Sequence, residues 1–458
     1  MEYNKYDIND ILRYAKLLEN KTLNIIGINN TYSTKDKGHF NKLVEQEYFK
    51  IPNNNIQEPD FKEVGVELKV TPLKFNKKDN RLTIKERTVL TKIDYNTISQ
   101  ETWDNCSLKK KAFKILFCFY IYEIDKNCMD YIIPLVGIWS PSNEDMEIIK
   151  QDWLIIQQKV CQGKAHEISE KDTLYLSACT KGSNNLQLTT QPYSDIKAKP
   201  RAFAFKRSYM ESIYNQLKYF SNLQDKYIVK NGQTLITSID NIFKQYYSKT
   251  IKELCEILDI QSNAKQLYSM ITNKILNVDD VQQIEEFKKA GIIVKSIRVD
   301  TNNKPIESIS FPNFVINDLI NETVWEESQL YNILEKKFLF IIYTISTDTV
   351  SEFKKLPKEK QQEFLTFSSF KLWSISDYHL GKMEELWNET KKILLTNIQV
   401  TKTPKGYSNN LPKSNFNGVG HVRPHGRNAK DIDYLPNGTP ITKQCFWLNN
   451  TFIRDELF

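Results

Sequence analysis

The sequence predicts an α/β protein built from two tandem domains. With 458 residues, the chain is longer than a single hydrophobic core usually supports. The second half repeats features of the first half in the same order, and each half combines amphipathic helical stretches with short apolar strands. We therefore expect two similar domains, each with its own buried core.

The helices and strands of the first half are indicated by their hydrophobic periodicity. Ile8, Ile11, Leu12, Ala15 and Leu18 recur at the spacing of one helix face. The segment 64–70 alternates apolar and polar residues, as a half-buried strand does, whereas the continuous apolar run 115–122 is typical of a buried strand. These elements predict a sheet with at least one helix packed against it.

The repeat is carried by landmarks that return in the second half. The helical pattern of the amino terminus recurs near residues 251–258, and the apolar strand 115–122 recurs as 338–345. The remaining pairs are Glu101-Thr102-Trp103 with Glu322-Thr323-Val324-Trp325, Trp139 with Trp373, Trp153 with Trp387, and Ala202-Phe203 with Cys445-Phe446. We therefore predict domains at 1–225 and 240–458, joined by a polar linker at 226–239. Residues 402–420, rich in Asn, Pro and Gly, predict a long loop.

Charge and cysteine content restrict the environment and the partners. Lys and Arg number 63 against 56 Asp and Glu, so the formal charge is +7, which mildly favours a polyanionic partner. The seven cysteines contain no Cys-x-x-Cys pair, which argues against a zinc site and predicts a reducing compartment. No signal-like segment starts the sequence, and the apolar runs are short, so we expect a cytoplasmic protein outside the membrane.

Acidic and basic residues around the strand at 64–70 indicate phosphodiester chemistry. Glu67 and Lys69 are two residues apart and would project from the same face of a strand, while Asp60 precedes the strand and can fold back towards Glu67. Two carboxylates are the usual protein contribution to a Mg²⁺ site in phosphoryl chemistry. A nearby lysine can stabilise charge that develops in the transition state. On a charged strand edge this spacing also arises by chance.

The wider sequence resembles the MutH-like family, which comprises a mismatch-repair nickase and the Sau-type type II restriction endonucleases that cut at GATC. The segment 37–45 resembles the family's Lys-Gly helix, and 65–69 resembles its catalytic strand. The segment 191–199 is closer to the Sau-type enzymes than to the nickase. Further matches, in the family's order, are Trp139-Ser140-Pro141, Asp152-Trp153, Tyr175-Leu176 and Pro200-Arg201-Ala202-Phe203.

The resemblance implies a mixed sheet flanked by helices in each domain and assigns roles to individual residues. Asp60 and Glu67 would bind Mg²⁺, Glu45 would be a third active-site carboxylate, and Lys69 would act with a second lysine. That second lysine is Lys111 by position, with Lys114 as the rival. Expected DNA contacts are Lys37, Gly38, Lys181, Lys206, Arg207, Arg423, His425 and Lys430.

The second half keeps a DNA-reading pattern but loses the catalytic one. Ile293 stands opposite Glu67, so this copy lacks the central metal ligand, although Glu286 and Lys295 remain opposite Asp60 and Lys69. By contrast, residues 421–430 resemble the family's base-reading loop. The first half has Cys179-Thr180-Lys181 there, so Lys181 is the nearest substitute for the family's base-reading arginine. Only the first domain is therefore expected to hydrolyse DNA.

The sequence thus predicts a Mg²⁺-dependent type II restriction endonuclease that cleaves double-stranded DNA at GATC. The second domain would bind a second site and act allosterically, and the chain would be a monomer when free and a dimer on DNA. Two alternatives stay open: a repair-type GATC nickase, and a DNA-binding protein without catalytic activity.

Overall fold

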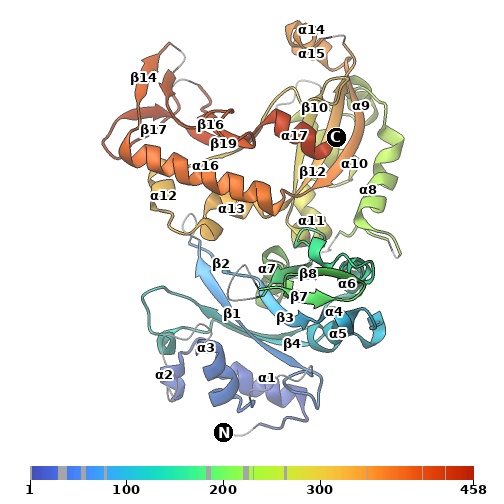
Figure 1. Cartoon of the computed structure of the whole chain (residues 1–458), viewed down its shortest axis with the longest axis vertical. Coiled ribbons are helices and arrows are strands. Elements are labelled where there is room, and N and C mark those ends of the chain that lie inside the picture. The colour runs from blue at the N-terminus through green and yellow to red at the C-terminus, as the bar shows by residue number, and fades with distance from the viewer. Residues whose placement is uncertain are drawn as a thin grey trace. The chain divides into compact units, whose positions relative to one another are not determined.

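The computed structural model describes residues 3–28, 39–52, 58–76, 80–181, 187–219, 226–230, 232–261, 266–347, 349–404, 406–428 and 430–458. The chain forms two compact units, residues 1–235 with 284–290, and residues 236–283 with 291–458 (Figure 1). Both units combine helices with mixed or antiparallel sheets, which confirms the predicted α/β class. No helix in the described ranges is long and apolar enough to cross a membrane.

The first unit is built on a mixed sheet with the strand order β2-β1-β4-β5. Its strands are β1 (Glu67–Phe75), β2 (Leu82–Ile84), β4 (Ile115–Ile121) and β5 (Leu135–Trp139). Strands β1 and β4 are parallel, and the other pairs are antiparallel. Helix α1 (Ile8–Lys16) begins at the N-cap Asp7, and its residues Ile11 and Tyr14 join Leu68 and Cys118 in one buried cluster. One face of the sheet is thus covered by the amino-terminal helices (Figure 1).

A second, antiparallel sheet of the first unit has the order β3-β9-β6. Its strands are β3 (Thr88–Ile93), β6 (Leu176–Thr180) and β9 (Arg201–Phe205), with a separate hairpin of β7 (Thr189–Gln191) and β8 (Ser194–Ala198). Phe119 of β4 contacts Tyr214 of α7 (Arg207–Tyr219), so this helix packs on the face of the main sheet opposite to α1. The other helices are α2 (Leu23–Ile26), α3 (His39–Lys42), α4 (Tyr95–Ile98), α5 (Ser107–Ala112) and α6 (Asn143–Cys161).

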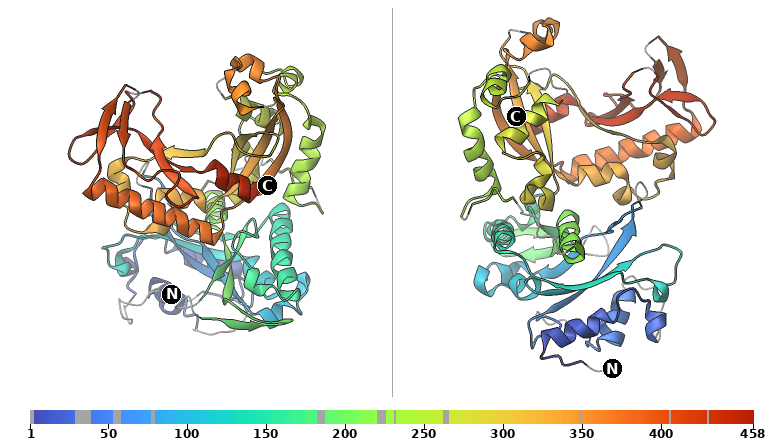
Figure 2. Two further views of the ribbon diagram at one scale, coloured as in Figure 1. Left: turned by 45° about the horizontal axis from the view of Figure 1, so that its top comes forward. Right: turned by 180° about the vertical axis from the view of Figure 1, so that it is seen from behind.

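The second unit repeats this plan. Its main sheet has the order β10-β12-β13, with strands β10 (Ile292–Val299), β12 (Lys337–Ile345) and β13 (Leu365–Trp373), and its second sheet has the order β11-β19-β16. The strands of the second sheet are β11 (Ile309–Asn313), β16 (Gly420–Pro424) and β19 (Gln444–Leu448). Helix α16 (Asp377–Thr396) lies along this sheet in both views of Figure 2. The other helices are α8 (Leu235–Phe243), α9 (Ile251–Ile257), α10 (Leu267–Ile275), α12 (Ile316–Asn321), α13 (Gln329–Leu334), α14 (Val350–Lys355), α15 (Lys358–Gln361) and α17 (Asn450–Leu457).

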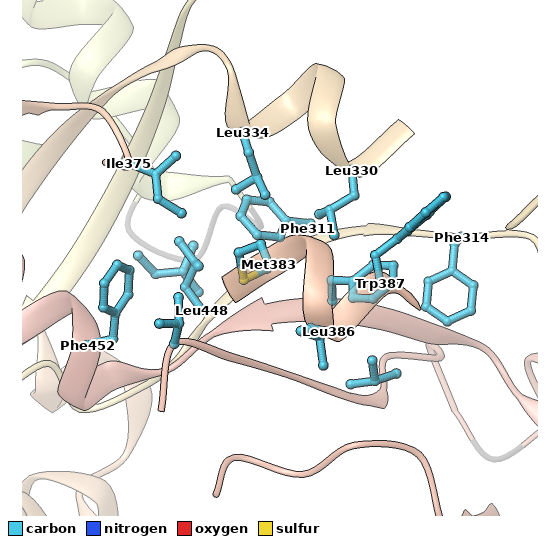
Figure 3. Packing of buried hydrophobic residues seen from close by; sticks show 14 of the residues in the cluster. Phe311, Phe314, Leu330, Leu334, Ile375, Met383, Leu386, Trp387, Leu448 and Phe452 are labelled. Carbon is cyan, nitrogen blue, oxygen red and sulfur yellow. The ribbon is translucent and has the colours of Figure 1, made fainter. Parts of the chain in front are cut away.

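The core of the second unit joins helices α13, α16 and α17 to the second sheet. Figure 3 shows Met383, Leu386 and Trp387 of α16 between Leu330 and Leu334 of α13 and the strand residue Leu448. These side chains are at most 3 % exposed. Helix α16 therefore presents a wide apolar face to the sheet.

Strand register supports the repeat that the sequence predicts. Ile115 pairs with Glu67 and with Trp139, and Phe338 pairs correspondingly with Ile293 and with Trp373. The buried tryptophans also recur, because the ring centroids of Trp103 and Trp153 are 5.8 Å apart and those of Trp325 and Trp387 are 5.6 Å apart. The central strands of the two units therefore pair in the same register, and Ile293 stands in β10 where Glu67 stands in β1.

Two local expectations were wrong. The strand expected at 64–70 begins only at Glu67, because residues 61–66 form a turn in which the amide of Val66 donates to the carbonyl of Phe61. The long loop expected at 402–420 contains instead a hairpin of β14 (Val400–Thr403) and β15 (Gly406–Asn409). Gly406, which has a φ of 118°, supplies the turn that closes this hairpin. A further hairpin joins β17 (Ile432–Tyr434) to β18 (Pro440–Thr442).

Helix α11 (Glu285–Ala290) packs with the first unit although it lies within the second repeat. The ammonium of Lys289 donates to both oxygens of Asp145, at 2.8 Å and 3.0 Å, and to the hydroxyl of Tyr227. Burial lowers the pKa of Lys289, but the Asp145 carboxylate outweighs that effect and raises it above its usual value. Glu286 accepts hydrogen bonds from the amides of Ile228 and Val229. The helix is therefore an integral part of the first unit.

Candidate active site

Strand β1 places Glu67 and Lys69 side by side at its amino-terminal end. The ammonium of Lys69 donates to Oε1 of Glu67 at 2.7 Å, and the side chains of Lys69 and Glu67 are 19 % and 3 % exposed. Glu67 pairs with Ile115 of the neighbouring strand β4, and its side chain is shielded from water. Burial raises the pKa of Glu67, and Asp60 adds to this effect, whereas Lys69 and Lys111 oppose it.

Asp60 is brought back to the strand by the turn at residues 61–66. Gly65 has a φ of 66°, a conformation that residues with a Cβ atom rarely adopt, and it allows Val66 to pair with Phe61. As a result, Oδ2 of Asp60 accepts a hydrogen bond of 2.9 Å from the amide of Leu68. The expectation that Asp60 folds back towards Glu67 is thus met by the geometry.

Glu45 lies in η1 (Leu43–Tyr48), a single π-helical stretch that continues α3. π-Helical stretches are rare in proteins, and those that occur are often found at functional sites. Burial, followed by repulsion from Asp60, raises the pKa of Glu45 to about 7, and Glu67 contributes in the same direction. The carboxylates of Glu45, Asp60 and Glu67 therefore interact electrostatically with one another.

Lys111, and not its rival Lys114, reaches the carboxylates. The ammonium of Lys111 is 3.6 Å from Oε1 of Glu67, and its side chain is 16 % exposed. Lys114 is exposed, and its carbonyl accepts a hydrogen bond from the amide of Glu67 in the sheet. Helix α5, which ends immediately before β4, therefore contributes the second lysine of the cluster.

The residues present fit a divalent cation that keeps much of its water. Within the described ranges, no three His, Cys, Asp or Glu side chains form a complete metal cage. Oε2 of Glu67, however, is buried and has no hydrogen-bonding partner among the described residues, with Asp60 and Glu45 nearby. A buried carboxylate oxygen without a partner is costly, and Mg²⁺ binds through one or two carboxylates and substrate phosphate. Asp60 and Glu67 suit this type of site.

The corresponding place in the second unit cannot act in the same way. Ile293 replaces Glu67, and the ammonium of Lys295, the counterpart of Lys69, donates to the carbonyl of Ser310. Glu286, the counterpart of Asp60, binds backbone amides of the linker. Among the described residues, β10 therefore has no counterpart of the buried Glu67 carboxylate.

Comparison with known proteins identifies the fold that carries this cluster. The family model described as "DNA mismatch repair enzyme MutH" matches residues 49–152. The type II restriction enzyme Sau3AI of Staphylococcus aureus is 32 % identical to the chain over 459 aligned residues, which cover 90 % of this chain and 91 % of that enzyme. The chain belongs to the MutH-like family of type II restriction endonucleases. The MutH proteins of Vibrio campbellii and Shewanella baltica are 27 % and 26 % identical but cover only 42 % and 40 % of this chain.

Two of the DNA contacts expected for the second unit, Arg423 and His425, are exposed and lie beside the ring of Trp447. Arg423 is exposed on β16, with its guanidinium carbon 4.2 Å from the ring centroid of Trp447. His425 meets the same ring edge-on at 5.2 Å, and His421 is stacked on it at 6.1 Å. Lys430 is also exposed. A cation and aromatic rings gathered on a sheet face suit contacts with bases.

The contacts expected for the first unit are less uniform. Lys181 is exposed at the end of β6, and Arg207 is half-buried at the start of α7. Lys206 is also half-buried, and its ammonium donates to the carbonyl of Thr173 and attracts the buried Asp152 carboxylate, so it helps to hold the fold together. Lys37 and Gly38 lie outside the described residues. Their DNA contacts, like those of the other residues, stay predictions.

Two features of the first unit were missed by reasoning from sequence. Arg87, immediately before β3, donates to Oγ of Ser177 at 3.2 Å and forms an ion pair with Glu170. Lys289 pairs with the distant Asp145. Both contacts join residues far apart in the chain, and no local spacing signals them. The replacement of Arg-Pro by Cys179-Thr180 is visible in the sequence, but it gives no signal of the contacts that Arg87 makes.

Proposed function

We propose that this chain is a Mg²⁺-dependent type II restriction endonuclease that hydrolyses double-stranded DNA at GATC. The first unit would be catalytic, and the second would bind a further copy of the site. The observation that carries this proposal is the cluster of Glu67, Lys69 and Lys111 beside Asp60 and Glu45, within a fold shared over nearly the full length of Sau3AI. The recognition sequence rests on the family resemblance.

Each residue of the cluster would have a different role in phosphodiester hydrolysis. Asp60 and Glu67 would hold Mg²⁺, which supplies Lewis-acid polarisation of the scissile phosphate when bound. Lys69, held at 2.7 Å from Glu67, would orient the attacking water and offset negative charge in the transition state. Lys111 would stabilise the same charge from a second direction. Glu45, with a pKa of about 7, would support the metal site or orient water.

The direct test uses the full chain and a plasmid with mapped GATC sites. Incubation with Mg²⁺ should yield double-strand breaks whose ends lie at GATC, and EDTA should prevent them. Breaks at another sequence would overturn the assignment of GATC, but the chain would still be a site-specific endonuclease. Intact DNA under all divalent cations tested would contradict the enzyme itself and favour a binding protein without catalytic activity.

A repair-type nickase is the second candidate within the same family. The MutH proteins resemble less than half of this chain, whereas the resemblance to Sau3AI extends through the second unit, which favours the restriction enzyme. The kinetics of plasmid conversion separate the two. A nickase accumulates the open circle as its final product, whereas a restriction enzyme proceeds to the linear form.

The proposed function predicts how chains assemble on DNA. Each chain would have one catalytic cluster and two surfaces that bind DNA. Because one cluster cuts one strand, a double-strand break calls for two chains on one site or two successive cuts. Coupling between two sites is typically worth about 1–3 kcal/mol, so two-site plasmids should be cut roughly 5- to 150-fold faster than one-site plasmids. The comparison of initial rates at equal site concentration measures this, with sedimentation to detect a dimer on DNA.

Arg423→Ala supplies the matched variant for that experiment. It removes the exposed guanidinium over Trp447 and leaves the first unit unchanged. We expect it to abolish the advantage of two-site DNA and to weaken specific binding by the second unit by about 1–3 kcal/mol. If Arg423→Ala weakens binding to cognate and scrambled duplexes equally, the residue contacts phosphate and not bases. Equal rates on both plasmids for the unmodified chain would make the second unit a passive clamp.

A further inference from the structure

The second sheets of the two units can be compared residue by residue because their registers match. Ala204 of β9 pairs with Ser177 and Val89, and Trp447 of β19 pairs with His421 and Ser310. The same register places Cys179, which pairs with Ala202, at the position of Arg423, which pairs with Cys445. In the first unit, the positions of Arg423, Trp447 and His421 are thus taken by Cys179, Ala204 and Ser177.

Because of these three replacements, this face of the sheet in the catalytic unit lacks the guanidinium and the aromatic rings that the second unit has. Cys179 and Ala204 are small and buried, and they form an apolar cluster with Ala202 that Val89 flanks. Neither a thiol nor a methyl group can form the paired hydrogen bonds that identify a guanine. A catalytic unit that cuts at a defined sequence therefore needs a guanidinium or ammonium at another position, and Lys181, exposed at the end of β6, is a single point charge without the planar fork of an arginine.

Arg87, immediately before β3, places its guanidinium beside the residues that replace His421 and Arg423. It donates to Oγ of Ser177, the counterpart of His421, at 3.2 Å. Its positive charge also acts on the Cys179 thiol, the counterpart of Arg423. The side chain is 34 % exposed, so the guanidinium remains accessible to solvent beside the sheet.

Strand β3, which follows Arg87, lies next to the catalytic strand. Thr71, on the same side of β1 as Glu67 and Lys69, has its hydroxyl oxygen 3.3 Å from that of Thr88, the residue after Arg87. The second unit has a similar link, because Lys295 of β10 donates to the carbonyl of Ser310 on β11. Arg87 therefore lies at the start of a strand that contacts the strand of the acidic cluster.

We propose that Arg87 is a specificity-determining residue of the catalytic unit and contacts a guanine through N7 and O6 in the major groove. Its partner Glu170 has a side chain that is 33 % exposed, so the ion pair lies at the surface, where DNA can displace the carboxylate. Glu170 would then hold the guanidinium in place until DNA arrives. This inference rests on the proposed function, since a base-reading residue presupposes sequence-specific cleavage.

The test compares Arg87→Ala and Arg87→Lys with the unmodified chain on cognate, single-mismatch and scrambled duplexes. A bidentate contact is worth about 1–3 kcal/mol, so Arg87→Ala should cut the cognate roughly 5- to 150-fold more slowly and lose discrimination against the mismatched guanine position. Binding to the scrambled duplex should change less than about threefold. Arg87→Lys should recover only part of the discrimination, because an ammonium lacks the planar fork.

Substitution of 7-deazaguanine in the site identifies the atom that is read. Removing N7 should slow the unmodified chain and leave Arg87→Ala unaffected, because the partner of N7 is already absent. Arg13→Ala is the matched control, since Arg13 also lies in the first unit and pairs with an acidic side chain at the surface, Asp10. Equal sensitivity of Arg87→Ala and the unmodified chain to deazaguanine would overturn the proposal.

A structural role for the ion pair predicts a different result. In that case Glu170→Gln and Arg87→Ala would lower the unfolding midpoint together, and discrimination would be unchanged. Under our proposal, Glu170→Gln keeps discrimination, because the guanidinium remains. If the unmodified chain itself fails to cut DNA, the proposed function fails. If it cuts and Arg87→Ala still discriminates normally, only the role of Arg87 fails.

Discussion

Glu67→Ala and Lys69→Ala should each lower the rate of DNA cleavage by more than about 100-fold while specific DNA binding remains. Glu67 is buried, shares Oε1 with two lysines and has Oε2 without a partner among the described residues, as expected of a metal ligand. Lys69 provides the positive charge nearest to that carboxylate. Single-turnover cleavage with excess enzyme measures the chemical step, and fluorescence anisotropy without Mg²⁺ measures binding.

Lys114→Ala serves as the matched control for the lysine variants. Lys114 lies close to Lys111 in sequence, but its side chain is exposed, and no described contact joins its ammonium to Glu67. We expect Lys111→Ala to slow cleavage at least tenfold and Lys114→Ala to leave the rate nearly unchanged. Near-normal cleavage by Glu67→Ala or Lys69→Ala would place the active site elsewhere. Equal loss for both variants of the Lys111–Lys114 pair would indicate a general effect of positive charge.

The parts of this site that sequence could predict depend on short-range geometry. Residues two apart on a strand share a face, so the pairing of Glu67 with Lys69 follows from spacing alone. The return of Asp60 depends on a tight turn that Gly65 permits. The repeat of the two units was also visible, because buried tryptophans such as Trp153 and Trp387 occupy equivalent positions in both cores.

The parts that sequence could not predict involve pairings across the chain. Lys206, for example, is predicted to contact phosphate because it follows a strand in a basic dipeptide, but its hydrogen bond to the carbonyl of Thr173 has no local signal. The strand at 64–70 was predicted to begin too early, because alternation of side chains does not distinguish a turn from an extended segment. The docking of α11 into the first unit has no local signal.

Lys289→Ala should lower the free energy of unfolding of the first unit by about 3–5 kcal/mol. Lys289 is fully buried, and its loss would leave Asp145, 2 % exposed, as a buried charge without its cation. Tyr209 still donates to Asp145, but one neutral hydroxyl cannot replace the ammonium. Urea denaturation of the full chain, followed by tryptophan fluorescence, measures the change. Lys252→Ala, in an exposed pair with Glu363, should leave the urea midpoint nearly unchanged.

Combining Lys289→Met with Asp145→Asn separates the cost of an unpaired charge from the value of the pair. Removing both charges should restore most of the stability, since two neutral side chains of similar size need no counterion. The amide oxygen that Asp145→Asn introduces can still accept the hydrogen bond from the Tyr209 hydroxyl. If the double variant is no more stable than Lys289→Ala, the helix is held by packing of residues such as Phe287 and the ion pair is incidental.

The same ion pair decides how the role of the second unit is best tested. If the pair is the anchor, a chain ending near residue 225 lacks Lys289 and leaves Asp145 as a buried charge without its cation. Such a fragment should unfold at a lower urea concentration than the first unit does in the full chain. Loss of the response to two-site DNA in that fragment would then report instability as much as a missing second site. Single substitutions such as Arg423→Ala, made in the full chain, therefore test the role of the second unit better than truncation.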